Sequence, residues 1–99
     1  MIRKDILDTA TNCVCGQREE DYGTPEDSFR AIAALWSYWL GAPISTHDVP
    51  IMMALLKIAR IKTGQIKDDN YVDTCGYVAC AAEIALSGKT WDIRKGSQE

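Results

Sequence analysis

The 99-residue sequence lacks several features that mark large classes of protein. No apolar run approaches the roughly 20 residues that a membrane-spanning helix needs, and the opening MIRKDILDTA has no apolar signal-peptide core. Basic residues are not in excess, because 11 Lys and Arg stand against 14 Asp and Glu. The composition therefore predicts a cytoplasmic protein with no membrane partner and no duplex nucleic acid partner, since phosphate backbones attract basic surfaces.

Residues that hold metals through nitrogen or sulfur are also scarce, with one histidine and four cysteines. On a helix Cys13 and Cys15 would point about 200° apart, and Cys75 and Cys80 about 140° apart, whereas zinc ligands converge on one ion. We interpret the cysteines as small buried apolar residues in a reducing compartment. His47 has no catalytic partner near it in the sequence, so we expect a surface or capping role.

Glycine and proline divide the chain into four segments of helical periodicity, with no strand-like alternation and no repeat. Thr24 followed by Pro25 is typical of a helix start, and Ser45 is expected to cap another helix. The expected helices cover residues 2–15, 25–40, 46–63 and 69–87. We predict an all-α, four-helix, bundle-like protomer, with one helical domain over residues 1–88 and a polar, partly loose tail over residues 89–99.

The expected second helix has more apolar surface than one core contact uses. Its core stripe consists of residues at helical spacing, namely Phe29, Ile32, Ala33, Trp36 and Leu40. Leu35 and Trp39 widen that stripe, and Tyr38 faces the other way. We interpret the excess as a subunit interface, which predicts a homo-oligomer. The alternative is that the following segment, PISTHDVP, folds over those rings.

The expected third helix, VPIMMALLKIARIK, is apolar nearly all round. A helix without a polar face is typical of a central position, so we predict that it is the most buried helix and pairs antiparallel with the fourth. Lys57 and Arg60 lie three residues apart on it and are therefore neighbours. Either they extend along the helix to reach water, or they face a polar pocket.

The expected fourth helix has a polar stripe in the stretch KDDNYVDTCGY. Asp69, Asp73 and Tyr77 lie at positions i, i+4 and i+8, flanked by Asn70 and Gly76. A glycine within a helix costs about 1 kcal/mol relative to alanine. Its presence is favourable where a neighbouring helix or a ligand approaches the backbone closely.

Folding the third and fourth helices into a hairpin through TGQIKD aligns the basic pair with the acidic stripe. Counting from the turn, Arg60 comes level with residues 70–73 and Lys57 with residues 73–76. Asp73 is therefore expected within reach of Lys57 or Arg60, beside a pocket. The alternative is a buried ion-pair network that only fixes the register of the two helices.

The polar segment QREEDYGTPED adds further candidates before the second helix. Carboxylates are the ligands that Mg²⁺ prefers, Lys and Arg bind phosphate, and Tyr rings stack on bases, so the combination indicates a nucleotide site. We therefore expect Mg²⁺ as a cofactor and a nucleotide or other phosphate-bearing small molecule as a partner. The candidate substrate-binding residues are Arg18, Tyr22, Lys57, Arg60, Asn70 and Tyr77, and the candidate metal ligands are Glu20, Asp21, Asp69 and Asp73.

Three spaced motifs, EDYGTPEDSFRAIAALWSYWLG, HDVPIMMALLKIARIKTG and DDNYVDTCGYVACAAEI, resemble a family of small helical phage and prophage proteins of uncharacterised function. The K-x-x-R and D-x-x-x-D-x-x-x-Y hairpin is more distantly similar to the nucleotide-modification-associated domains of phages and to MazG-like all-α nucleoside triphosphate pyrophosphohydrolases. The resemblance implies Mg²⁺ bound by acids on two helices, a dimer or tetramer, and residence in the host cytoplasm if the protein is phage-encoded.

The sequence departs from the MazG-like enzymes, which carry an E-x-x-E helix followed by an E-x-x-D helix. Asn70 and Asp73 keep the spacing of the second pair, whereas Lys57 and Arg60 stand on the helix that precedes them. The first hypothesis is a nucleotide-related phage protein, either a pyrophosphohydrolase or a nucleotide-modification-associated protein. The second is a non-catalytic oligomeric binder that sequesters a nucleotide signal or blocks a host protein. The third is a structural helper without a ligand.

Overall fold

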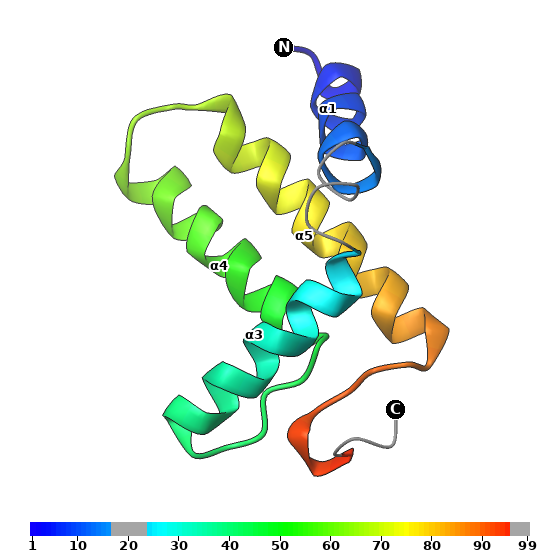
Figure 1. The fold of residues 1–99 in the computed structure, drawn as a ribbon. Helices are drawn as coiled ribbons and strands as arrows, with labels where there is room; N and C mark the ends of the chain where they lie inside the picture. The colour runs from blue at the N-terminus through cyan, green and yellow to red at the C-terminus, as the bar shows by residue number, and fades with distance from the viewer. Residues whose placement is uncertain (17–23, 96–99) are drawn as a thin grey trace.

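The computed structural model describes residues 1–16 and 24–95, which form four α-helices and one short 3₁₀ helix (Figure 1). They are α1 (Arg3–Cys15), α3 (Pro25–Leu40), α4 (Asp48–Thr63), α5 (Asp68–Ser87) and η1 (Ile93–Lys95). The described residues contain no strand, so the predicted all-α, bundle-like fold is confirmed. None of their helices has the length and apolarity needed to cross a membrane.

The helices begin and end where local side-chain chemistry favours it. At the start of α3, the Thr24 hydroxyl accepts a hydrogen bond from the Asp27 N–H. Before α4, the Ser45 hydroxyl accepts from the Asp48 N–H, and the Asp48 carboxylate accepts from the Ser45 N–H. Gly41 and Gly88 end α3 and α5 at φ values of 68° and 71°, which glycine adopts without strain. The sequence-based helix boundaries therefore agree closely with the structure.

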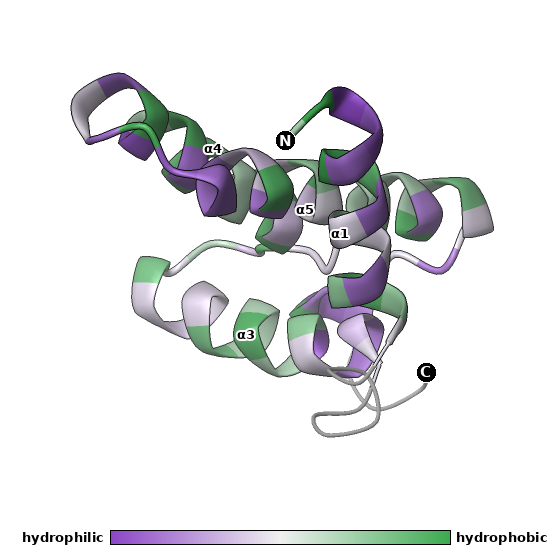
Figure 2. Ribbon diagram, turned by 90° about the horizontal axis from the view of Figure 1, so that it is seen from above, coloured by the Kyte–Doolittle hydropathy of each residue, from purple (hydrophilic) through white to green (hydrophobic). Residues whose placement is uncertain are grey.

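The helices α4 and α5 form the predicted antiparallel hairpin, which is the largest packing unit of the fold (Figure 1). Helix α1 packs on α5, and α3 crosses the start of α4 as a separate layer on one face of the hairpin (Figure 2). The core cluster lies where α3, the first turn of α4, the second half of α5 and the segment after α5 meet. It consists of Phe29, Ala33, Val49, Cys80, Ile84 and Trp91.

Burial of the hairpin is unequal. Helix α5 contains six buried residues, whereas α4 contains three, all in its first half. The prediction that the third helix is the most buried is therefore wrong for the protomer. The reason is that α5 lies between α4 and α1, whereas α4 has little cover besides α5 along its second half. Leu55, Leu56 and Ile58 of α4 are consequently exposed.

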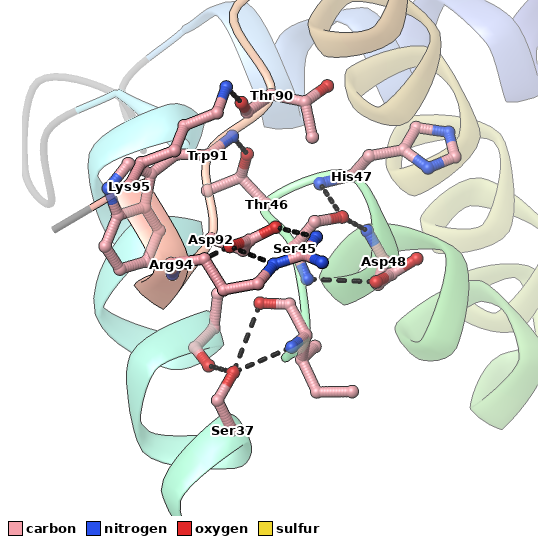
Figure 3. Close-up of polar contacts among 12 residues, drawn as sticks. Ser37, Ser45, Thr46, His47, Asp48, Thr90, Trp91, Asp92, Arg94 and Lys95 are labelled. Atoms are coloured by element: carbon pink, nitrogen blue, oxygen red, sulfur yellow. Dashed lines mark hydrogen bonds and ion pairs between the residues drawn. The ribbon is translucent and has the colours of Figure 1, made fainter. Parts of the chain in front are cut away.

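The segment after α5 is anchored to the domain by Trp91 (Figure 3). The Thr46 N–H donates to the Trp91 carbonyl at 2.8 Å, and the Trp91 N–H donates to the Thr46 hydroxyl at 2.9 Å. The indole ring is 8% exposed, and the Arg30 guanidinium lies 4.7 Å from its centroid. The expectation of a loose tail is therefore wrong for residues 90–95, and residues 96–99 lie outside the described residues.

The segment between α3 and α4 packs against the inner side of α3, at Ser37 (Figure 3). The buried Ser37 hydroxyl donates to the Ala33 carbonyl and accepts from the Ile44 N–H, both at 2.7 Å. Tyr38 and Trp39 stay exposed on the other side. The alternative that PISTHDVP folds over those rings is therefore wrong.

Candidate functional site

An ion pair between α4 and α5 marks the candidate site. The Lys57 Nζ lies 2.8 Å from the Asp73 Oδ2. The Lys57 side chain is 15% exposed and the Asp73 side chain 34% exposed, so water reaches the carboxylate more freely than the ammonium group. The predicted contact between the basic pair and Asp73 is confirmed.

Asp73 also lines a cavity of about 320 Å³ between α1, α3 and α5. Gly76 and Tyr77 follow it along the same wall of α5. The remaining wall is mostly apolar and comes from several elements, as Cys13, Val14, Thr24, Pro25, Ser28, Phe29, Ile32, Met53, Val72 and Cys80. One carboxylate and one phenol thus meet an apolar space whose size lies at the lower end of small-molecule pockets.

Gly76 brings α1 close to α5. A Cβ atom at this position would lie 3.0 Å from the Val14 Cγ1, tighter than an ordinary van der Waals contact. The neighbour predicted from this mid-helix glycine is therefore a helix, α1. The same close approach sets one wall of the cavity, because Val14 and Gly76 both line it.

Two candidate residues lie away from the cavity. Arg60 and Asp69 are exposed, do not line it, and form no ion pair with another residue that the structure describes. Asn70 is buried, and its backbone carbonyl accepts a hydrogen bond from the Thr74 hydroxyl at 2.6 Å. The structure therefore brings together Lys57, Asp73 and Tyr77 from the predicted set. The remaining candidates, Arg18, Glu20, Asp21 and Tyr22, lie outside the described residues.

The acids of residues 1–16 and 24–95 do not assemble a metal site. Within these ranges no three His, Cys, Asp or Glu side chains are grouped so that they could hold an ion. Asp73 is paired with Lys57, and Asp69 is exposed. The predicted Mg²⁺ site thus depends on Glu20 and Asp21, and no chemical step through Mg²⁺ is derived from the described residues.

Comparison with known proteins gives a family for the chain. The model of a domain of unknown function, DUF6378, matches residues 5–85. The chain belongs to the DUF6378 family. It is similar to the Gene 55 protein of Mycobacterium phage D29, with 38% identity over 81 residues, and to that of Mycobacterium phage L5, with 39% identity over 82 residues.

The match to each phage protein covers 82% of this DUF6378 chain, but only 54% of the D29 protein and 53% of the L5 protein. The chain thus spans about half the length of these curated relatives. No solved structure matches it. The expected resemblance to phage proteins of uncharacterised function is confirmed, and the more distant resemblance to nucleotide enzymes stays a prediction.

Sequence reasoning missed the apolar walls of the cavity in the DUF6378 chain. The core stripe of α3 indicated that Phe29 and Ile32 face inward, but nothing in the sequence placed them opposite Asp73. The cysteines were also misjudged. Cys80 is buried as expected, whereas Cys13 and Cys15 are exposed, because α1 packs against α5 alone along one side.

Proposed function

We propose that this DUF6378 chain binds a nucleotide or another phosphate-bearing small molecule in the cavity between α1, α3 and α5. The observation that carries the proposal is the double position of Asp73, which pairs with Lys57 and lines the cavity beside Tyr77. A carboxylate accepts hydrogen bonds from the N–H groups of a base, and a tyrosine ring next to it offers a stacking surface. Apolar walls exclude water from the flat faces of such a ring.

The positive charge that a phosphate requires comes from Lys57 in this proposal. Its ammonium group lies at the Asp73 carboxylate, so a phosphate that approaches Asp73 also approaches a cation. Arg60 is one helical turn further along α4 and is exposed, which leaves its guanidinium accessible to a ligand. The cavity thus suits a ligand with an aromatic ring at one end and an anionic group at the other.

Two activities are compatible with such a ligand. Mg²⁺-dependent hydrolysis, as in MazG-like enzymes, would need Glu20 and Asp21 to complete a metal site with Asp73 or Asp69. A non-catalytic binder, which sequesters a nucleotide or presents it to a host protein, needs no metal. The pairing of Asp73 with Lys57 favours the binder, because the ammonium group already neutralises the acid that a metal would require.

A thermal-shift screen of a nucleotide panel, with and without Mg²⁺, tests the proposal. A specific ligand is expected to raise the Tm of the wild type, because it binds the folded state only. Asp73→Asn and Tyr77→Ala should abolish that shift, whereas the matched control Leu86→Ala, at an exposed position outside the cavity, should retain it. Incubation of any bound triphosphate with protein and Mg²⁺, followed by chromatography, then separates hydrolysis from binding.

A wild type whose Tm no nucleotide raises at millimolar concentration would remove the proposal. If Asp73→Asn then also lowered the free energy of unfolding strongly, the ion pair would be a register clamp between α4 and α5. A ligand that shifts the Tm equally in the wild type and in Asp73→Asn would mean that it binds elsewhere on the chain.

A further inference from the structure

The second half of α3 has a solvent-facing surface that is both apolar and uncharged. No Asp, Glu, Lys or Arg occurs between residues 31 and 47. Within this stretch Leu35, Tyr38 and Trp39 are 68%, 86% and 84% exposed. Their spacing of three and four residues places them on one side of the helix, which we term the α3 outer face. Single exposed apolar residues are normal, but an uncharged group with two large aromatic rings is typical of an interface core.

The opposite side of α3 already has its partners. Phe29, Ala33 and Ser37 are buried there, and the Ser37 hydroxyl binds the Ile44 N–H of the following segment. In Figure 1 the second half of α3 extends away from the α4–α5 hairpin, and no described element lies over it. Its ribbon is predominantly apolar in Figure 2. The outer face therefore has no cover within the described residues of one protomer.

The total surface of the protomer indicates how large the missing contact is. The chain exposes 7019 Å², whereas a folded monomer of 11.0 kDa is expected to expose about 5,600 Å². The excess of about 1,400 Å² is larger than the roughly 800 Å² that each partner covers in a standard interface. The radius of gyration, 14.3 Å, likewise exceeds the roughly 13 Å expected for a compact chain of this length.

We propose that a second copy of this chain covers the α3 outer face, through a two-fold interface in which α3 of one protomer packs on α3 of the other. A two-fold contact brings the same patch of both copies together, so the patch must tolerate its own image. The net charge of −3 opposes the approach of two copies elsewhere on the surface, but the outer face carries no charge to repel its image. Tyr38 and Trp39 supply the aromatic contacts that contribute most to such interfaces.

Light scattering coupled to size-exclusion chromatography of the full chain tests this interface. The wild type should elute with a mass of about 22 kDa, twice the mass of one chain. Trp39→Glu and Tyr38→Glu should give about 11 kDa with an unchanged helical circular dichroism spectrum, because both side chains are exposed in the protomer. Tyr38→Ser, which adds no charge, should raise the dimer dissociation constant by roughly 30-fold or more.

Two matched variants locate the contact. Ile66→Glu changes a side chain that is 93% exposed in the α4–α5 turn and should leave the mass at about 22 kDa. Leu55→Glu changes an exposed leucine of α4 and should also leave it there. A monomeric wild type at 100 µM, a dimer that survives both glutamate changes in α3, or a dimer that only Leu55→Glu dissociates would each overturn the proposal.

Discussion

Lys57 on α4 and Asp73 on α5 form an ion pair that fixes the register of the hairpin, with 2.8 Å between Nζ and Oδ2. The lysine side chain is 15% exposed and the aspartate 34% exposed, so the pair lies between a surface pair and a buried one. Exposed pairs contribute little because water and salt screen them, whereas an isolated buried charge is costly. Removal of one partner should therefore cost more than removal of both.

Asp73→Asn and Lys57→Met should each lower the free energy of unfolding by roughly 1–3 kcal/mol, since each leaves one partly buried charge without its partner. The double variant should cost less than the sum of the two. Urea denaturation of the four proteins measures the coupling. Asp8→Asn is the control, because Asp8 pairs with Lys4 on the exposed surface of α1 and should cost less than about 1 kcal/mol. Strictly additive effects would show that the 2.8 Å contact does not stabilise the fold.

Trp91→Ala should lower the free energy of unfolding by about 3–5 kcal/mol, because it removes a buried ring from the core cluster. It also removes the surface on which the Arg30 guanidinium lies. Guanidinium denaturation followed by circular dichroism measures the effect. Leu86→Ala, at an exposed position of α5, should stay within about 0.5 kcal/mol of the wild type. Equal stabilities of these two variants would mean that residues 90–95 do not pack on the domain in solution.

Stability in acid should depend on Asp92. The Arg94 side chain, which lies 2.7 Å from this carboxylate, lowers the pKa of Asp92 from 3.8 to about 2. Because the folded state favours the ionised form, the stabilisation is present above about pH 4 and is lost as the pH falls toward 2. Asp92→Asn should flatten the pH dependence of the Tm across that window. In Arg94→Gln, an NMR titration should find the pKa of Asp92 returned toward 3.8, and a wild-type value near 3.8 would contradict the prediction.

The contact of Gly76 with Val14 can be tested by a paired substitution. Gly76→Ala alone places a methyl group 3.0 Å from the Val14 Cγ1, so its gain of about 1 kcal/mol in helix propensity is offset by crowding. In a Val14→Ala background that crowding is absent, and the same change should be more favourable by about 1 kcal/mol. Thermal unfolding of the four proteins measures the difference. Identical effects of Gly76→Ala in both backgrounds would show that α1 does not approach α5 at this point.

The sequence by itself determined the features that depend on residues a few positions apart. Thr24 with Pro25 starts α3, Gly41 ends it, and hydrogen bonds over three residues decide such boundaries. The contact of Lys57 with Asp73 was also predictable, because a short turn between antiparallel helices fixes which residues lie level. The half of the candidate site that lies on the hairpin could thus be derived by counting.

Only the tertiary structure decided which sides of those helices are covered. The walls of the cavity depend on where α1 and α3 lie against α5, and the Thr46–Trp91 pair joins residues 45 positions apart. Helical periodicity shows that a face is apolar but not which element covers it, so α4 was expected to be buried and residues 90–95 to be loose. Such placements result from many weak non-local contacts, none of which leaves a pattern among neighbouring residues.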